Sequence, residues 1–187
     1  MEREYVYDAF ISYRHTKLDK TIADNLQRKL ERYLPPSSAL GGRAVKKLRV
    51  FRDETELPTS SNLSEDIRTA LEGSRFLIVL CSKTTAQSKW CMQEITYFKE
   101  LNGGRTDNII TVLTEGDPSE VFPTELCTET RTIANADGTT RAETIDVEPL
   151  AANVSAATEG ASLRKLKREF LRVAAPLFGC GFDALYP

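Results

Sequence analysis

The 187-residue sequence is poor in the side chains that bind metals or cross-link secreted proteins. It has a single histidine, His15, which argues against a zinc site. Its four cysteines (Cys81, Cys91, Cys127 and Cys180) form no CxxC pair and no metal-ligand spacing. Cys81 lies in an apolar run and is interpreted as a small buried hydrophobe. We therefore expect no bound metal and a reducing, cytoplasmic compartment.

The chain also lacks a strong charge of one sign and a membrane-length apolar segment. It has 25 Lys and Arg against 27 Asp and Glu, and the resulting net charge of −2 argues against nucleic acid as a partner. The N-terminus has no apolar stretch of the kind found in signal peptides, and no window is long enough to span a bilayer. We therefore expect no membrane partner for this segment.

Several common motifs of nucleotide and hydrolase chemistry are missing. There is no GxGxxG after the first predicted strand and no GxxxxGK[ST], which excludes ordinary dinucleotide and P-loop sites. There is no GxSxG, and one histidine leaves little scope for a hydrolytic triad. A phospho-accepting receiver domain would need an aspartate at the end of the third strand, where residues 80–82 read LCS. With these motifs excluded, a catalytic or binding site would have to be built from loop residues and a carboxylate.

The chain does contain an alternation of strand-like and helix-like segments, the pattern of a parallel sheet covered by helices. The predicted strands span 7–13, 48–51, 76–81, 108–113 and about 144–148, and the main predicted helices span 18–34, about 62–73, about 90–102 and 162–177. We therefore predict a flavodoxin-like five-stranded parallel sheet of order 2-1-3-4-5, flanked by helices on both faces. Such a sheet collects ligands near its first and third strands.

This alternation fits one domain over 1–187, with its core at about 5–178. Residues 128–144 are polar and poor in apolar side chains, with Asp137-Gly138 as a plausible hairpin turn. They are interpreted as an excursion before the fifth strand. The chain stops at Pro187 without a clear end signal, so we expect it to be the N-terminal part of a longer protein.

Trp90, the only tryptophan, precedes Glu94 by four residues, which places both side chains on one face of the predicted helix. This helix follows the apolar strand 76–81, near the ligand-collecting edge of the sheet. An aromatic ring beside a carboxylate could hold a flat, cationic ring. The simpler interpretation is that Trp90 anchors the helix and Glu94 is solvated, and the spacing alone favours it.

Three segments together resemble the signature boxes of TIR domains (Toll/interleukin-1 receptor domains). Residues 7–13 (YDAFISY) resemble the first box, and residues 50–53 (VFRD) followed by 56–58 (ELP) resemble the second box and its mobile loop. Residues 90–94 (WCMQE) match the WxxxE pattern of the members that cleave NAD. The chain departs from the family at 58–59, where many adaptor-type loops carry Pro-Gly, and it lacks the third, Phe-Trp box. Both departures favour a bacterial-type, enzymatic member.

The resemblance implies an NAD+ glycohydrolase that needs no cofactor and has NAD+ as its substrate. The products would be nicotinamide and ADP-ribose or a cyclic form of it, made in defence signalling. By the resemblance, Glu94 is the catalytic residue and Trp90 walls the nicotinamide-ribose pocket by stacking. The end of the first strand and the loop after it would contact the substrate through Ser12, Tyr13, Arg14 and His15. Arg14 is a plausible phosphate contact because its guanidinium is always charged, the alternative being a surface salt bridge.

The loop Arg52–Ser61 has two candidate roles. Arg52 and Asp53 could pair to hold the loop beside the substrate, and Leu57 at its tip could contact a second TIR domain. In the family, active sites are commonly completed when domains assemble head to tail, and such heterologous contacts build open filaments. The resemblance therefore implies other TIR domains as partners, with an oligomer or filament as the active form.

Two other hypotheses stay open. The domain could be a non-catalytic TIR interaction module that recruits other TIR domains, or a nucleoside transferase or hydrolase on a related flavodoxin-like fold. The Trp90 and Glu94 pair favours the NAD-cleaving enzyme.

Overall fold

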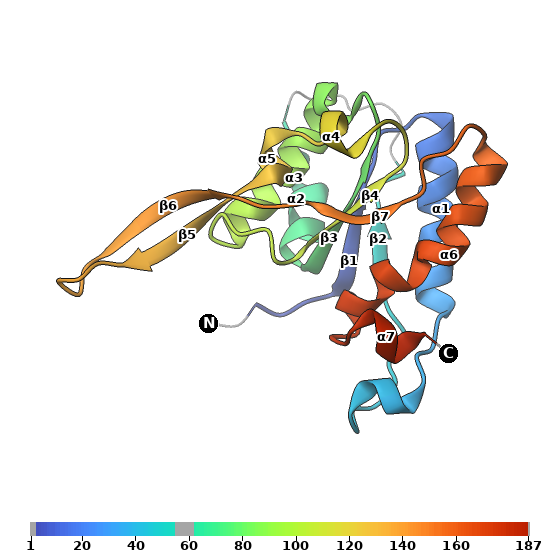
Figure 1. Cartoon of the computed structure of the whole chain (residues 1–187), viewed down its shortest axis with the longest axis horizontal. Coiled ribbons are helices and arrows are strands. Elements are labelled where there is room, and N and C mark those ends of the chain that lie inside the picture. Colours follow the sequence, from blue (N-terminus) through green and yellow to red (C-terminus); the bar gives the residue numbers. More distant parts are fainter. Residues whose placement is uncertain (1–2, 55–61, 187) are drawn as a thin grey trace.

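The computed structural model describes residues 3–54 and 62–186, and its centre is a parallel sheet of five strands (Figure 1). The strands are β1 (Tyr7–Ser12), β2 (Val50–Arg52), β3 (Ser74–Cys81), β4 (Ile109–Leu113) and β7 (Leu150–Asn153). Their order is β2-β1-β3-β4-β7, and every neighbouring pair is parallel. The predicted flavodoxin-like sheet with the first strand beside the third is therefore confirmed.

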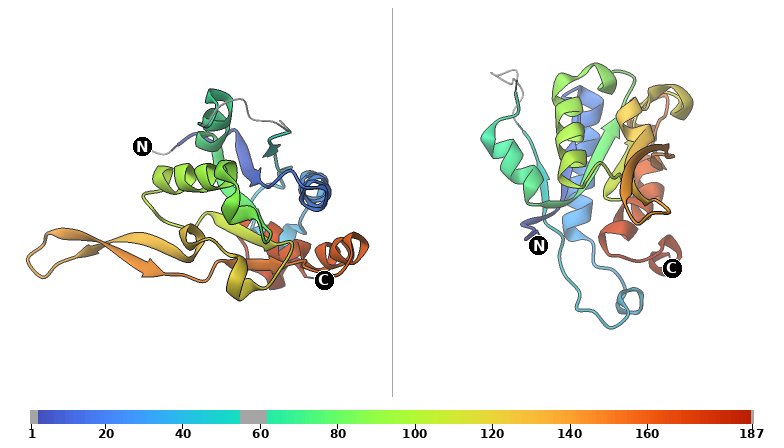
Figure 2. Two further views of the ribbon diagram at one scale, coloured as in Figure 1. Left: turned by 90° about the horizontal axis from the view of Figure 1, so that it is seen from above. Right: turned by 90° about the vertical axis from the view of Figure 1, so that its left-hand side faces the viewer.

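Two pairs of helices cover the two faces of this sheet (Figure 2). On one face lie α1 (Lys17–Arg32) and α6 (Glu159–Leu177), and on the other lie α2 (Glu65–Glu72) and α3 (Lys89–Leu101). Strand β1 shows how the sequence divides its side chains between them, because successive residues of a strand point to opposite faces. Ala9 and Ile11 pack on the α1 side, and Phe10 packs on the α3 side. Ser12 therefore points toward α3.

Short helical elements complete the chain between and after these main elements. They are the 3-10 turns Ser37–Leu40 and Thr85–Gln87 and the helices α4 (Pro118–Val121), α5 (Thr124–Cys127) and α7 (Phe182–Leu185). The last of these leads to the C-terminus beside the end of α6, as the red segment of Figure 1 shows. No helix of the described residues has the length and apolar character required to cross a membrane.

The fifth strand of the sheet was wrongly placed by the sequence pattern. The predicted strand around Thr144–Glu148 is instead the end of β6 (Thr140–Asp146), which pairs antiparallel with β5 (Thr128–Ala134) outside the main sheet. The turn of this hairpin contains the predicted Asp137-Gly138, and Gly138 has a φ of 86°, which favours glycine. The fifth sheet position is filled by β7, which begins four residues after β6 ends.

The hairpin leaves the body as a long arm but is firmly attached at its base (Figures 1 and 2). The Lys99 ammonium donates hydrogen bonds to the carbonyl oxygens of Glu125 and Thr128 at 2.7 and 2.8 Å. The Thr130 amide donates to the Gly104 carbonyl at 2.9 Å. Gly104 has a φ of 82°, and a Cβ added there would lie 2.8 Å from the Thr130 Cβ, so this close approach requires glycine.

Candidate active site

Glu94 occupies a position of α3 where an apolar residue would be expected. The helix begins at a Ser88 cap, and the residues that it buries are Cys91, Glu94, Ile95 and Phe98. This spacing of three and four forms one stripe facing the sheet. Glu94 is only 7% exposed, so its carboxyl group is held inside the protein and not in solvent. The hypothesis of a solvated Glu94 is therefore wrong.

The Glu94 carboxyl group is hydrogen-bonded to the side chain at the end of β1. Ser12 donates a hydrogen bond from its Oγ to Glu94 Oε1 at 3.1 Å, and Ser12 itself is 1% exposed. The two residues are 82 positions apart, and the fold brings them together where β1 and β3 lie side by side. The chain runs from β1 toward β2 and from β3 toward β4, so this is the switch point where open α/β sheets bind ligands.

Burial shifts the ionisation of this carboxyl group. Desolvation raises the pKa of Glu94 to about 8, and the negative charge of Asp53 adds to this increase. The hydrogen bond from Ser12 acts in the opposite direction but does not offset burial. Without a ligand, Glu94 is therefore mostly protonated at neutral pH. A cation placed against it would favour the carboxylate, because opposite charges attract strongly in a poorly solvated site.

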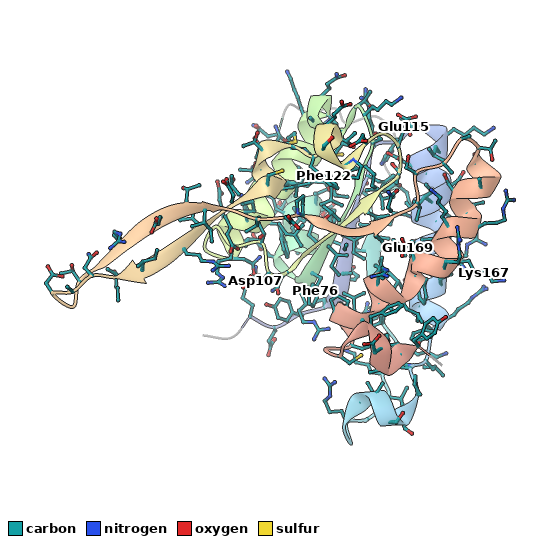
Figure 3. The ribbon with its side chains drawn as sticks, viewed as in Figure 1. Phe76, Asp107, Glu115, Phe122, Lys167 and Glu169 are labelled. Atoms are coloured by element: carbon teal, nitrogen blue, oxygen red, sulfur yellow. The ribbon has the colours of Figure 1, made fainter. Side chains whose placement is uncertain are left out.

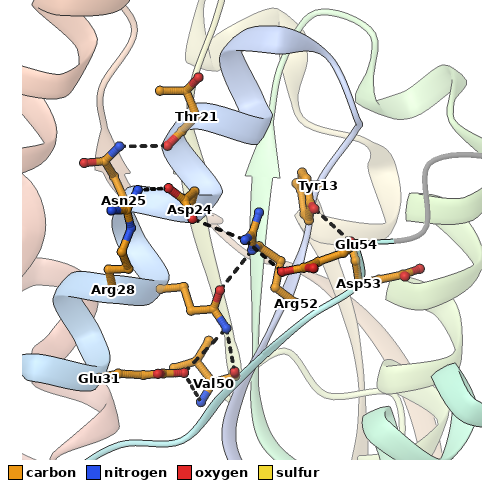
Figure 4. Close-up of polar contacts among 11 residues, drawn as sticks. Tyr13, Thr21, Asp24, Asn25, Arg28, Glu31, Val50, Arg52, Asp53 and Glu54 are labelled. Carbon is orange, nitrogen blue, oxygen red and sulfur yellow. Dashed lines mark hydrogen bonds and ion pairs between the residues drawn. The ribbon is translucent and has the colours of Figure 1, made fainter.

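The residues that follow β1 hold the start of the loop predicted to line the site. Tyr13 is buried on the α1 side, and its hydroxyl donates a hydrogen bond to the Asp53 carbonyl oxygen at 2.7 Å (Figure 4). The His15 ring stacks on the Tyr13 ring with centroids 4.6 Å apart. These contacts place Asp53 at the edge of the sheet, within electrostatic reach of Glu94.

Arg14 and Trp90 flank the loop between β3 and α3. Arg14 Nη1 donates to the carbonyl oxygen of Thr84 at 2.9 Å, so this guanidinium is tied to that loop. Trp90, in the first turn of α3, is half-buried. Both residues lie at the carboxyl edge of the sheet, as does Ser12.

Arg52, in contrast, lies on the other side of the sheet from Glu94. Its guanidinium donates to Gln27 at 2.9 Å and pairs with Asp24 at 3.3 Å, both on α1, and it pairs with Glu54 at 3.1 Å (Figure 4). The Arg52 side chain is 10% exposed. It therefore acts as an anchor that joins the end of β2 to α1. Leu57, the predicted loop-tip contact, lies outside the described residues.

Loss of this anchor is expected to destabilise the domain. In Arg52→Met, three polar contacts of a nearly buried guanidinium disappear, so the free energy of unfolding should fall by about 1–3 kcal/mol. Urea unfolding at constant pH measures this difference. Arg28 provides a matched control because it also pairs with Asp24 but is 59% exposed, so Arg28→Met should change stability by less than about 0.5 kcal/mol. Equal losses in the two variants would contradict the anchor role.

A second buried carboxyl group lies near the carboxyl edge of the sheet and was not predicted from the sequence. Asp19, in the first turn of α1, is fully buried and accepts a hydrogen bond from Thr114 Oγ1 at 2.7 Å. Burial raises the pKa of Asp19 to about 6. The same Thr114 hydroxyl also lies 3.1 Å from the Cys81 carbonyl oxygen, so Asp19 fixes the start of α1 against the ends of β3 and β4. The signal available in the sequence was an acid at a helical position that carries a core stripe, Asp19-Ile22-Ala23-Leu26.

The cysteine thiols near the site are unreactive at neutral pH. Cys81 and Cys91 are both buried, as expected for Cys81, and burial raises the pKa of the Cys91 thiol to about 12. Neither thiol is therefore a nucleophile at neutral pH. Within the described part of the chain, no three His, Cys, Asp or Glu side chains are grouped as a metal site would require.

Comparison with known proteins agrees with this architecture. The family model of the TIR domain matches residues 9–148, a segment that includes both Ser12 and Glu94. NAD(+) hydrolase ApTIR of Actinoplanes sp. is 38% identical over 111 residues, which cover 59% of this chain but 14% of ApTIR. TMV resistance protein N of Nicotiana glutinosa is 27% identical over 115 residues, covering 62% of this chain and 9% of that protein.

Among solved structures, the TIR domains of the activated Roq1 resistosome share 28% identity and cover 60% of each chain with a TM-score of 0.47. The chain therefore spans only a small part of the length of its sequence relatives. The family model, however, matches most of this chain, from β1 to the hairpin. The chain belongs to the TIR domain family.

Proposed function

We propose that this TIR domain is an NAD+ glycohydrolase that breaks the bond between nicotinamide and ribose, with Glu94 as its catalytic carboxylate. The observation that carries the proposal is the buried Glu94 carboxyl group, hydrogen-bonded to Ser12 at the switch point of the sheet. Its placement fits the 38% identity to ApTIR, a protein named as an NAD(+) hydrolase. A buried acid that is expensive to ionise is a common mark of a functional site.

The chemistry requires one carboxylate and no general acid at the leaving group. Nicotinamide is bound to ribose as a cationic pyridinium and departs neutral, so it needs no proton. Positive charge develops instead on the ribose as an oxocarbenium-like centre. Water then adds to this carbon and loses a proton, which gives nicotinamide, ADP-ribose and H+. If a nitrogen of the adenine adds in place of water, the product is a cyclic ADP-ribose.

Burial of Glu94 makes it suited to this task. The bound NAD+ brings a cationic ring to a carboxyl group whose pKa is about 8, and the cation favours loss of the carboxyl proton. The resulting carboxylate faces the developing positive charge in a poorly solvated site, where the attraction is stronger than in water. The Ser12 hydroxyl fixes the orientation of the carboxylate by its hydrogen bond.

The other residues at the carboxyl edge of the sheet would bind the substrate. Trp90, one turn before Glu94, would wall the nicotinamide-ribose pocket by stacking. Arg14 and His15 would contact the nucleotide from the loop after β1, and Asp53 would contact it from the loop after β2. The Arg52–Ser61 loop of one domain, with Leu57 near its tip, would meet a neighbouring domain and complete the site.

The closed state of the isolated domain supports activation by assembly. Glu94 is only 7% exposed, so little of its side chain is open to a substrate. Substrate access therefore requires a rearrangement near α3, which contact with a second domain would supply. The same closed state favours the alternative function, a non-catalytic TIR interaction module.

A turnover assay separates the two functions. The purified domain is incubated with NAD+ both dispersed and clustered on a multivalent support, and nicotinamide release is followed by chromatography. We expect release in the clustered sample at a rate well above that of the dispersed sample. The chromatogram also separates ADP-ribose from cyclic products. If the clustered domains are shown to associate by light scattering and still release no nicotinamide, the interaction module is the correct function.

A further inference from the structure

The β5–β6 hairpin is the part of the molecule that the proposed chemistry does not use. It reaches away from the sheet, and its side chains project from both faces without a neighbouring element over its outer part (Figure 3). In β6, six of the seven residues are exposed, and Ile145 is the single half-buried one. The base of β5 is covered instead, since Glu129 is buried and Thr130 is bound to Gly104. The free edge of this arm is therefore β6.

The hydrogen-bond pattern of the hairpin shows which backbone groups lie on that edge. The Val147 amide donates to the Cys127 carbonyl, and the Asn135 amide donates to the Thr139 carbonyl, at the two ends of the ladder. Because hydrogen-bonded and non-hydrogen-bonded pairs alternate in an antiparallel ladder, the inward groups of β6 belong to residues 141, 143 and 145. The amides and carbonyls of Thr140, Ala142 and Thr144 point outward. Within the described residues, no backbone hydrogen bond engages them.

The sequence of this edge is complementary to itself. Residues 140–144 read Thr-Arg-Ala-Glu-Thr, with a threonine at each end and opposite charges on the two residues beside Ala142. When two copies run antiparallel with Ala142 opposite Ala142, each Arg141 faces a Glu143 and each Thr140 faces a Thr144. Opposite charges and threonine pairs directly across an antiparallel ladder are both stabilising. In this register the outward residues 140, 142 and 144 form the hydrogen-bonded pairs, as their backbone directions require.

Edge strands commonly carry charges that discourage such pairing, but the charges on this edge attract the same edge of a second copy. Within one chain, Arg141 and Glu143 lie 3.7 Å apart on the same face of β6, a loose and exposed ion pair. A second copy offers each of these side chains an oppositely charged partner directly across the ladder. Nothing on this edge repels its own copy in the Ala142-centred register.

We propose that β6 pairs with β6 of a second copy of this chain, with a two-fold axis through Ala142, to form a continuous four-stranded antiparallel sheet. Such an interface is isologous and closes a dimer, unlike head-to-tail contacts, which extend filaments. A five-residue edge buries less surface than a stable dimer needs. The pairing is therefore weak between free domains and becomes effective when another contact holds them close together.

A cysteine at the two-fold axis tests the geometry. In Ala142→Cys, the paired strands bring the two sulfur atoms close enough to be joined by a short bis-maleimide, because Cα atoms of such a pair lie about 5.5 Å apart. Thr132→Cys is the matched control, since Thr132 is the exposed residue directly opposite Ala142 on β5. In the dimer, one additional strand on each side separates the two Thr132 residues, so they lie two strand spacings of about 4.8 Å further apart than the two Ala142 residues. With the domains clustered on a multivalent support, which brings them close enough for the weak pairing, we expect cross-linked dimer from Ala142→Cys, and only the background of the unmodified chain from Thr132→Cys.

Charge reversal in the Ala142→Cys protein tests the register. Arg141→Glu and Glu143→Arg each place two like-charged pairs across the interface, so each should lower the yield of cross-linked dimer about tenfold. Mixing the two single variants restores opposite charges between different chains, and the double variant restores them within one sequence. Both should recover the yield of the parent. Similar yields from Ala142→Cys and Thr132→Cys, or single reversals without effect, would overturn the proposal.

Discussion

At pH 8, the Glu94→Gln variant is expected to unfold at a higher temperature than the wild-type domain. The pKa of Glu94 is raised to about 8 in the folded state, from an ordinary value of 4.5. Between these two values the unfolded chain binds fewer protons than the folded one, so wild-type stability falls as pH rises. Glutamine keeps the size of the side chain and can accept the Ser12 hydrogen bond through its amide oxygen, but it never has to be ionised.

The size of the stability gain in Glu94→Gln follows from the pKa shift of Glu94. One pKa unit corresponds to about 1.4 kcal/mol, so the stability that the wild-type domain loses by ionising Glu94 at pH 8 is of the order of 3–5 kcal/mol. At pH 5 most of this loss is absent, and the two proteins should differ by less than about 1 kcal/mol. Denaturant unfolding at both pH values measures these differences.

Two controls keep the interpretation specific. Glu100→Gln changes an exposed acid on the same helix and should leave the pH dependence unchanged. Asp19 adds a similar slope between its ordinary value of 3.8 and about 6, and it is intact in both proteins. A Glu94→Gln protein that is less stable than wild type at both pH values would show that Glu94 is a structural residue held by favourable contacts.

A stability gain from removing a carboxylate has a functional meaning. A core residue that weakens the fold at neutral pH is expected chiefly at a functional site. The neighbours of Glu94 in the α3 stripe are Cys91, Ile95 and Phe98, all suited to an apolar core. The acid among them is thus best explained by the chemistry proposed for the site.

The layered sheet could be predicted from the sequence because its inner strands carry dense apolar runs. Residues 76–81 and 108–113 predicted strands close to β3 and β4, and the stripe from Leu18 to Leu34 predicted a helix close to α1. The edge strand β7 could not be found in the same way. Its residues Ala151, Ala152 and Asn153 have low strand propensity, and β7 is held in place by pairing with β4.

The sequence pattern wrongly assigned part of the β5–β6 hairpin to the main sheet. The sequence predicted a strand only at about 144–148 and took residues 128–144 as a polar excursion, whereas β6 spans Thr140–Asp146. Residues 140–146 include β-branched side chains that suit a strand, but they form no apolar face that the main sheet could bury, and this is what places β6 outside it. A strand that has no core to cover is free to pair at its edge.

The candidate site was predicted only in part. The resemblance pointed to Glu94, and the fold places it at the expected edge of the sheet. The contact between Ser12 and Glu94 depends on the pairing of β1 with β3 and on which face of β1 Ser12 occupies. Burial of Asp19 and its bond to Thr114 also arise from tertiary packing, as does the placement of Arg52 against α1. Local sequence does not specify such contacts.

The central claim is that the Glu94 carboxylate stabilises the positive charge that develops on the ribose. The most direct test compares initial rates of nicotinamide release by clustered wild-type, Glu94→Gln and Glu100→Gln domains at the same NAD+ concentration and pH. Loss of the carboxylate that we propose faces the reacting carbon should lower the rate about 1000-fold or more in Glu94→Gln, while Glu100→Gln stays within about twofold of wild type. Because Glu94→Gln is expected to be the more stable protein, unfolding cannot account for such a loss. A Glu94→Gln domain that releases nicotinamide within about tenfold of the wild-type rate would contradict the assignment.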